Sequence, residues 1–582
     1  MNKQYFFERN LLALSQKDPA LCSRLSGAET TRGRYRFLDA RSGDLVPALT
    51  DPSGAAHPLH SLMDPRREGE RLVSAALRVP DTPVNAEGET ARSAEGYVVL
   101  LGLGGGYNAR AALEREDVHR LLVVDYDIHG IAELLASKEY IGIFQDPRFH
   151  ILVDPDPGML EGFILETYRP ALYGGIRVIP LRTRTELDPL NFGRAGEAVK
   201  NALDRIAGDY SVQAYFGTRW FSNIIRNLFR AEGPERPLPP VRRAAICAAG
   251  PSLDTQLPRL AESRKSRFVI ATDTALPVLL HRGLTPGAVV SIDCQHIGYH
   301  HFMAGLPPDI PLFMDLASPP FLASLTGNPR FFSGGHPLTR YISRYWRSFP
   351  GIDTSGVNVT YAAVSLAEYL GAEEIELYGA DFSYPMGRTY ARGTYIHPYF
   401  EARQTRLNPQ EAQASAFLYR TSALAKHGRE DGSWYYATSL LQNYCRGLEA
   451  KARSMDAVLT AVPGLGAVIS LPERTPKHRE SLRLFSAGQA AAGAGEFLEN
   501  YRGEIAALPR SGRNITAFLR GLTEQESLIL TTLLPACAAI ARRRNGLSAP
   551  EVLEAVRDHS LKELDAVLKT ANRWRPRRGT RP

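Results

Sequence analysis

Polar side chains that can bind a nucleotide follow an apolar run in the middle of the chain. Residues 244–249 have the length and composition of a buried strand, and Gly250, Pro251 and Ser252 interrupt them before a helical pattern begins. The pattern predicts a strand, a glycine-containing turn and then a helix capped by Ser252 or Asp254. Such a turn places backbone N–H groups where a phosphate can bind. Any parallel sheet also needs such turns, so this turn alone leaves a structural and a functional interpretation open.

Polar residues also follow three later apolar runs of strand length. These are Asp273 and Thr274 after residues 267–271, Asp293 after residues 288–292, and Asp381 after residues 374–378. In an open parallel sheet the carboxyl ends of the strands lie on one edge, and ligands bind at that edge. The convergence of these residues therefore predicts a ligand site more strongly than any one motif does.

Other elements are expected around the same edge. Residues 313–315 and 331–333 read as two further strand ends. A helix is expected to begin near Asn358 and to run to Leu370, where Gly371 closes it as the C-cap residue.

A second glycine turn lies nearer the N-terminus, in GYVVLLGLGGGYNARAALE. Gly102, Gly104 and Gly106 separate an apolar strand from a helix, and the next strand ends at Asp125. That carboxylate falls about 20 residues past the glycines, the spacing at which it meets a ribose hydroxyl. The segment resembles the nucleotide-binding half of S-adenosylmethionine methyltransferases, although no Asp/Asn-Pro-Pro-Tyr-like motif follows. The alternative is a Rossmann-type scaffold whose glycines serve only the turn.

Composition narrows the class of protein. Of the 582 residues 44% are apolar, as in soluble globular domains, and no apolar run approaches the ~18–20 residues of a membrane helix. The N-terminus lacks the basic-then-apolar plan of a signal peptide. Five scattered cysteines without a C-x-x-C motif indicate buried thiols in a reducing compartment, not disulfides or a zinc site. A cytoplasmic protein without a membrane span is therefore expected.

Part of the chain's positive charge is concentrated in two short segments. The formal net charge is +7, and basic residues cluster at 542–544 and 573–581. A basic tail can bind nucleic acid, a membrane surface or an acidic partner, but a solvated tail is the preferred interpretation. No nucleic-acid motif with the required spacing is present. No nucleic-acid partner is expected.

The predicted fold class is α/β, with two Rossmann-like, doubly wound parallel-sheet domains in tandem. A small N-terminal β-containing region precedes them and a helical domain follows. The expected boundaries are an N-terminal α+β region at 1–90, a Rossmann-like domain at 91–235, a nucleotide-binding domain at 236–470 and a helical domain at 471–582. The linkers are a Pro-, Glu- and Thr-rich loop at 80–93 and the segment GPERPLPP at 233–240; helices are expected at 203–230, 482–508, 515–534 and 548–572.

Several motifs together resemble the MptE-like domain family. They are the GPSL turn, IATDTALPVLLHRGLTPGAVVSID and LAEYLGAEEIELYGADFSYPMGRTYARGTY, within residues 240–445. The family includes archaeal 6-hydroxymethylpterin diphosphokinases and bacterial motility-accessory-factor (Maf) glycosyltransferases. LHSLMDPRREGERL and the GLGGGY region look like the N-terminal parts of the larger Maf members, and the archaeal enzymes are much shorter. The architecture therefore favours the Maf branch.

The Maf resemblance implies transfer of a nonulosonic acid from a CMP-sugar to Ser or Thr of a protein such as flagellin, with no cofactor required. The backbone of Gly250, Pro251, Ser252 and Leu253 and the Ser252 hydroxyl would then bind the phosphate, with help from a helix N-terminus. Tyr384 or Tyr390 would add hydroxyl donors to the phosphate. The side chains of Asp273, Thr274 and Asp293 would contact cytidine and ribose. This chain has AAGPS where related sialyltransferases commonly have GNGPS, which removes one polar contact and leaves the nucleotide open.

The acceptor hydroxyl also needs a general base. His397 and His427 are candidates because they follow the GADFSYP segment and histidine titrates near neutral pH. Asp381 is the competing base, or else fixes its own turn.

Other functions remain open. A diphosphokinase would need Mg²⁺ on carboxylates, for which Asp273, Asp293 and Asp381 are the plausible set. Asp293, His296, His300 and His301 also cluster in sequence, but without an H-E-x-x-H context we expect no transition-metal site. A non-catalytic scaffold whose helical tail binds a partner is a third hypothesis, and methyl transfer at Gly102–Asp125 is a fourth.

Overall fold

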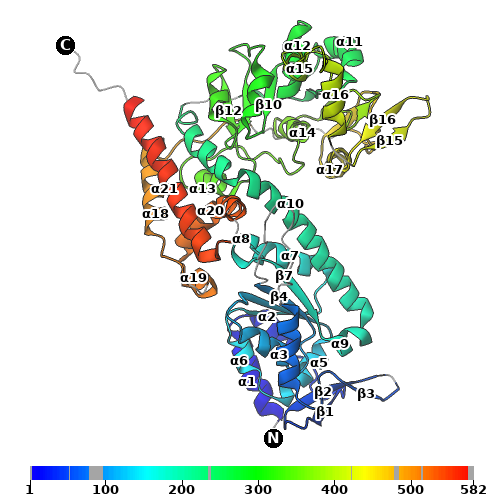
Figure 1. Cartoon of the computed structure of the whole chain (residues 1–582), viewed down its shortest axis with the longest axis vertical. Coiled ribbons are helices and arrows are strands. Elements are labelled where there is room, and N and C mark those ends of the chain that lie inside the picture. Colours follow the sequence, from blue (N-terminus) through cyan, green and yellow to red (C-terminus); the bar gives the residue numbers. More distant parts are fainter. Residues whose placement is uncertain are drawn as a thin grey trace, which may run out of the picture. The chain divides into compact units, whose positions relative to one another are not determined.

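A computed structural model describes residues 3–51, 53–77, 96–233, 238–420, 423–476, 484–512, 515–544 and 546–574 (Figure 1). The expected loop at 80–93, the middle of the expected linker and the basic tail beyond residue 574 lie outside these ranges. The chain divides into two compact units. The first comprises Met1–Gly217, Leu508–Ser527 and Leu534–His559, and the second comprises Thr218–Ala507, Leu528–Leu533 and Ser560–Pro582.

The first unit is built on a four-stranded parallel sheet. Its strands are β4 (Tyr97–Leu101), β5 (Arg120–Asp125), β6 (Phe149–Val153) and β7 (Ile176–Pro180), in the order β6-β5-β4-β7. Its helices are α4 (Tyr107–Leu113), α5 (Ile128–Ser137), α6 (Ile141–Phe144), α7 (Pro157–Thr167), α8 (Pro170–Tyr173) and α9 (Arg182–Leu187). All five residues of β4 are buried, as expected for a central parallel strand. The predicted Rossmann-like half-sheet is confirmed.

The N-terminal segment packs onto the same core. It forms α1 (Lys3–Ser15), α2 (Pro19–Ser26), α3 (Pro65–Ala76) and an antiparallel sheet of β1 (Tyr35–Asp39), β2 (Leu45–Thr50) and β3 (Ala56–Pro58). One hydrophobic cluster includes Leu14 and Leu49 from this segment together with Val98 and Val123 from the parallel sheet. The segment expected as a separate region therefore shares its core with the Rossmann-like sheet.

The second unit contains a seven-stranded parallel sheet. Its strands are β8 (Arg243–Cys247), β9 (Phe268–Thr272), β10 (Ala288–Ser291), β11 (Leu312–Asp315), β12 (Pro329–Phe332), β13 (Glu374–Tyr378) and β17 (Val458–Ala461). The order is β12-β11-β10-β9-β8-β13-β17, so the chain winds outward from β8 to β12 and then returns to the other side of β8. The topological switch point lies between β8 and β13, where open α/β sheets bind ligands.

The second unit also contains helices that follow the strands of this sheet, and a lobe inserted after β13. The helices are α11 (Leu253–Ser263), α12 (Leu276–His281), α13 (Pro337–Tyr345), α14 (Val359–Tyr369), α17 (Ser439–Ser454) and the 3-10 turns η1 (Asp273–Ala275), η2 (His296–Phe302) and η3 (Pro320–Ser324). The lobe between β13 and α17 carries α15 (Ile396–Glu401), α16 (Gln410–Tyr419) and an antiparallel sheet of β14 (Tyr384–Pro385), β16 (Trp434–Ala437) and β15 (Ala425–Gly428). Gly371 has φ +96° directly after the α14 C-cap Leu370, which confirms the predicted helix end.

The remaining helices differ in extent from the sequence prediction. They are α10 (Pro189–Asn227), α18 (Ala494–Ala507), α19 (Ile515–Gly521), α20 (Glu524–Arg543) and α21 (Ala549–Trp574). The helix expected at 203–230 begins earlier. The helix expected at 515–534 is broken before Glu524, because Thr523 and Glu526 form a capping box that starts a new helix there. No described helix is both long enough and apolar enough to cross a bilayer.

Helix packing in the first unit depends on one glycine. A Cβ built on Gly217 of α10 would lie 1.7 Å from the carbonyl oxygen of Pro535 in α20, whereas a Cβ on Gly208 of the same helix would meet nothing within 4 Å. The two helices therefore approach each other at a point where only glycine fits.

Gly217→Ala is expected to lower the free energy of unfolding by about 1–3 kcal/mol, because backbone atoms must move apart. Gly208→Ala is the matched control and should be neutral or stabilising, since alanine favours a helix over glycine. Thermal unfolding of both variants checks the pair, and equal melting temperatures would contradict the close approach.

Candidate functional site

A cleft of about 240 Å³ lies at the carboxyl ends of β8, β9 and β13, beside the first residues of α14. Gly250, Thr274, Asp381, Tyr384 and Tyr390 line it, so the fold brings together five of the predicted site residues. The cleft also includes polar residues that the sequence analysis did not assign to a site. These are Thr272, Asn358, Thr360, Ser383, Thr389 and Tyr444.

The N-terminus of α14 supplies hydrogen-bond donors to this cleft. Asn358 is the N-cap, and its side-chain oxygen accepts from the backbone N–H of Tyr361 at 2.9 Å. The first N–H groups of a helix have no partner within it, so those of Val359 and Thr360 suit an anion beside them. The sequence signal was the Ser-Gly-Val-Asn stretch before this helix, whose place beside the switch point only the fold reveals.

Two tyrosine hydroxyls add donors. Burial raises the pKa of Tyr384 and, more strongly, that of Tyr390. Both phenols therefore stay protonated at neutral pH and can donate a hydrogen bond to a phosphate. Among the residues that line the cleft, the only ionisable carboxyl is that of Asp381, which is buried.

The backbone beside the cleft is strained at two positions. Val357, directly before the N-cap of α14, has φ +56°, and Phe382, which lines the cleft, has φ +43°. Non-glycine residues rarely adopt this region, least of all a β-branched valine, and such strain concentrates at functional sites. The strain is thus an independent indication that this edge of the sheet does more than turn the chain.

Asp381 and Ser252 are hydrogen-bonded to each other. One carboxylate oxygen of Asp381 accepts from the Ser252 backbone N–H at 2.9 Å, and the other accepts from the Ser252 hydroxyl. The Ser252 oxygen in turn accepts from the N–H of Leu465 at 2.7 Å. Ser252 is 1% exposed and Asp381 4%. The net effect of burial, opposed by these bonds, is to raise the pKa of Asp381.

This pairing changes the interpretation of the glycine-containing turn. A Cβ on Gly250 would lie 2.1 Å from the Asp381 carboxylate, so the close approach requires glycine. Ser252 occupies the N-cap position of α11, but its side chain makes no capping bond because the hydroxyl points to Asp381. Pro251 and Leu253 are buried beside it. Only Gly250 of the turn lines the cleft, and the phosphate-binding role predicted for the other three stays a prediction.

The aspartates that follow β9 and β10 do not line the cleft. Asp273 is 1% exposed and accepts from the N–H of Thr274 at 2.7 Å and from the Ser291 hydroxyl at 2.8 Å, which ties the two strand ends together. Asp293 accepts from the N–H of Gln295 at 2.9 Å, and burial raises the pKa of its carboxyl. Their predicted nucleotide contacts stay predictions.

The three aspartates predicted as magnesium ligands, Asp273, Asp293 and Asp381, do not fit a magnesium site. The carboxylate oxygens of Asp273 and Asp381 already accept hydrogen bonds from the protein and are buried. Within the described ranges, no group of three or more His, Cys, Asp or Glu side chains is arranged to hold a metal ion, and this includes the cluster near His296.

The two predicted histidine bases lie in the lobe, outside the lining of the cleft. His397 is on α15, and its buried Nε2 has no hydrogen-bond partner among the described residues. His427 is on β15 and stacks on the ring of Tyr435 with centroids 5.2 Å apart. Their role as bases stays a prediction.

The glycine turn of the first unit is filled by protein side chains. Asp125 is fully buried, accepts from the N–H of Leu103 at 2.7 Å, and pairs with the buried Arg184 at 3.1 Å. His60 Nε2 accepts from the N–H of Gly105 at 3.0 Å and would lie 2.6 Å from a Cβ on Gly104.

The other glycines of this turn are equally enclosed. A Cβ on Gly102 would meet Leu181 and Arg184, and one on Gly106 would meet Ile143 and Tyr140. The contacts explain these glycines and Asp125 without a ligand, and binding of S-adenosylmethionine there stays an untested prediction.

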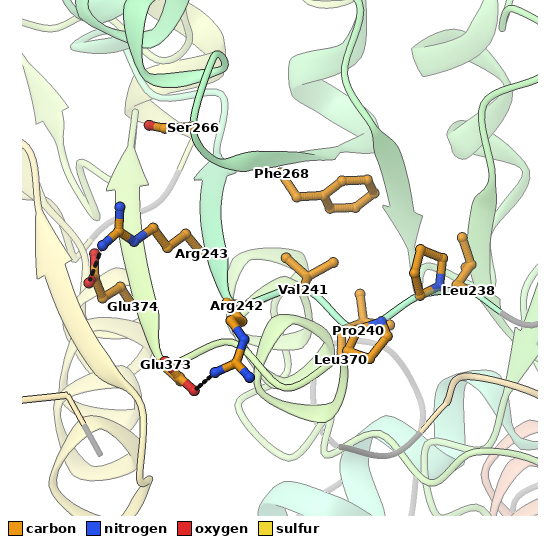
Figure 2. A pocket seen from close by; sticks show the side chains of 11 residues that line it. Leu238, Pro240, Val241, Arg242, Arg243, Ser266, Phe268, Leu370, Glu373 and Glu374 are labelled. Atoms are coloured by element: carbon orange, nitrogen blue, oxygen red, sulfur yellow. Dashed lines mark hydrogen bonds and ion pairs between the residues drawn. The ribbon is translucent and has the colours of Figure 1, made fainter. Parts of the chain in front are cut away.

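A larger cavity of about 540 Å³ lies at the opposite, amino-terminal edge of the second unit's sheet (Figure 2). Figure 2 shows its charged side chains paired with each other: Arg242 bonds Glu373 at 2.6 Å and Arg243 bonds Glu374 at 3.4 Å. Since ligands of open α/β sheets bind at the carboxyl edge, the smaller cleft is the better candidate.

Comparisons with known proteins place part of the chain in a described family. Residues 222–387 match the family described as 6-hydroxymethylpterin diphosphokinase MptE-like, a range that includes β8 to β13 and most of the cleft. One uncharacterised protein of Treponema pallidum (strain Nichols) is 35% identical over 153 residues, which are 26% of this chain and 54% of that protein. A second is 32% identical over 160 residues, which are 27% of this chain and 76% of that protein. The chain thus spans about half the length of the first relative.

A solved structure resembles nearly the whole chain. It is described as the structure of MAf glycosyltransferase from Magnetospirillum magneticum AMB-1, with a TM-score of 0.61 and 15% sequence identity. The match covers 98% of this chain and 96% of that one, so the two share a fold.

The fold and the cleft together define a class: a large α/β protein with two parallel sheets and a cleft at the switch point of the second. The chain belongs to the MptE-like family, and it shares its fold with the MAf glycosyltransferase structure.

Ser252→Ala should lower the free energy of unfolding by about 1–3 kcal/mol, because the variant removes the hydroxyl that donates to one oxygen of the buried Asp381 carboxylate and leaves the Leu465 N–H without its acceptor. Ser324→Ala is the control, since that exposed hydroxyl bonds only the carbonyl of Phe321. Denaturant unfolding measures both. Equal stability of the two variants would contradict a structural role for Ser252.

Asp315, which ends β11, gives the sheet edge a pH dependence. It accepts from the N–H groups of Ala317 and Gly334, yet burial raises its pKa to about 6. The folded state therefore binds the proton more tightly than the unfolded state. The stabilisation is full below about pH 4 and is lost as the pH rises through about 6.

Asp315→Asn removes this titration, so the parent should lose about 1–3 kcal/mol of stability between pH 4 and pH 8 that the variant does not lose. Asp309→Asn, at an exposed position, is the control. Unfolding measured from pH 4 to pH 8 tests this, and a parallel pair of profiles for Asp315→Asn and the parent would refute it.

Proposed function

We propose that the protein is a glycosyltransferase of the Maf type. It would take a nonulosonic acid from a CMP-sugar bound in the cleft of the second unit and transfer it to Ser or Thr of a protein such as flagellin. The observation that carries this proposal is the cleft at the β8/β13 switch point, which combines a helix N-terminus with a lining of hydroxyl groups. The family match and the fold shared with a Maf glycosyltransferase support it.

The cleft suits the departure of a nucleotide phosphate. In the reaction the bond from the anomeric carbon to the CMP oxygen breaks, and the acceptor oxygen bonds to that carbon. The negative charge that develops on the phosphate would be stabilised by the N–H groups of Val359 and Thr360 and by the hydroxyls of Tyr384 and Tyr390. These donors are held in place before the reaction, so the protein need not reorganise to provide them.

The acceptor hydroxyl loses a proton to a base. Asp381 is engaged with Ser252, which makes it a poorer candidate than the sequence suggested. His397 and His427 stay our candidates, because both lie on the lobe that begins with the cleft residue Tyr384. Approach of either to the cleft would require the lobe to move when substrate binds, as lids in many enzymes do.

Calorimetric titration tests the proposed nucleotide. CMP should bind the parent protein, and Tyr390→Phe and Thr274→Val should each weaken binding by about tenfold, the size of one hydrogen bond to a charged group. Tyr399→Phe is the matched control because Tyr399 lies outside the lining of the cleft.

The same titration separates the competing functions. Mg²⁺-dependent binding of ATP in place of CMP would favour pyrophosphoryl transfer, and binding of neither nucleotide would leave a scaffold. If Tyr390→Phe and Thr274→Val bind CMP as tightly as the control Tyr399→Phe, the nucleotide binds elsewhere in the chain.

A further inference from the structure

A second cavity opens on the carboxyl edge of the same sheet, at its far strand. It has a volume of about 690 Å³ and follows β12, where Ser333, Gly334 and Gly335 lead into α13. Its other wall is the segment 349–355, which continues into the α14 N-terminus of the nucleotide cleft. Cavities of this size accommodate small organic ligands.

Two arginines without an acidic partner line this cavity. Arg340 and Arg344 lie four residues apart on α13 and are exposed, and neither makes an ion pair within the described part of the chain. Like charges at this spacing repel each other. An anion placed between them would turn that repulsion into attraction.

Arg340 is directed towards the glycine loop. A Cβ on Gly335, whose φ is +90°, would lie 3.4 Å from the Arg340 Nη2, so the guanidinium lies over the loop backbone. The neighbouring Gly334 is equally constrained, since its Cβ would lie 2.2 Å from the Asp315 carboxylate and 2.8 Å from the Thr354 hydroxyl.

The remaining polar groups favour an anion. The side-chain oxygen of Ser343 is buried and has no hydrogen-bond partner within the described ranges. The only acid in the lining, Asp353, accepts from the Tyr361 hydroxyl at 2.7 Å and is paired with Lys451 at 3.5 Å. Lys451 also pairs with Glu368 at 3.2 Å, so it balances the charge of Asp353 only in part. The two arginines still exceed the single acid of the lining by one charge.

We infer that this cavity is a second binding site, separate from the nucleotide cleft, for a small molecule that carries a phosphate monoester or a similar dianionic group. Two planar guanidinium groups match the oxygens and the double charge of a phosphate better than the single charge of a carboxylate. The volume exceeds that of phosphate alone, so the site takes a larger molecule whose phosphate binds Arg340 and Arg344.

The inference is tested with inorganic phosphate, glucose 6-phosphate and glucose, titrated into the full-length protein at fixed ionic strength. Phosphate and glucose 6-phosphate should bind and glucose should not. R340Q/R344Q should weaken the binding of both anions at least tenfold, and R340K/R344K should weaken it less, because lysine keeps the charge and loses the planar fork. Tighter binding of glucose 6-phosphate than of phosphate would show that the cavity also contacts the sugar.

R264Q/R282Q is the matched control, since it removes the same charge from exposed positions of the second unit outside this cavity. It should bind both anions as the parent does. Tyr390→Phe, which alters the nucleotide cleft and not this cavity, should keep the glucose 6-phosphate binding that R340Q/R344Q weakens. Absence of phosphate binding in the parent, or equal weakening by the control, would overturn the inference while leaving the nucleotide cleft untouched.

Discussion

The buried hydrogen bonds between Asp381 and Ser252 are the constraint around which the second unit's cleft is arranged. They join the turn after β8 to the loop after β13, the two strands on either side of the switch point. The Ser252 oxygen also accepts from Leu465, so the segment after β17 is tied to the same point. Three chain segments far apart in sequence thus meet at one carboxylate, and Gly250 must be glycine to allow it.

In this arrangement, different residues stabilise the turns and face the cleft. The polar residues that stand out in the sequence, Ser252, Asp273 and Asp381, form buried hydrogen bonds that connect the strand ends. The groups left to face the cleft are neutral hydroxyls and the first N–H groups of α14. In the proposed function, these fixed dipoles would bind an anion and stabilise developing charge without having to reorganise. In the glycine turn of the first unit the conspicuous carboxylate, Asp125, is likewise a buried support, paired with Arg184.

Sequence reasoning could reach the sheets because parallel strands are short apolar runs that end in turns, as in residues 244–249 and 374–378. It could also place the ligand edge, since that follows from topology. It could not tell that the Ser252 hydroxyl points inward, or that His397 and His427 lie outside the cleft, because side-chain direction depends on contacts between distant segments. The N-terminal segment was likewise expected to stand apart, although its apolar residues complete the core of the first sheet.

A crystal structure of the protein with bound CMP tests the central claim most directly. The account predicts the phosphate beside the N–H groups of Val359 and Thr360, within hydrogen-bond distance of the Tyr390 hydroxyl. Asp381 should still be bonded to Ser252 in that complex. CMP bound at the amino-terminal edge near Arg242, or at the glycine turn of the first unit, would contradict it.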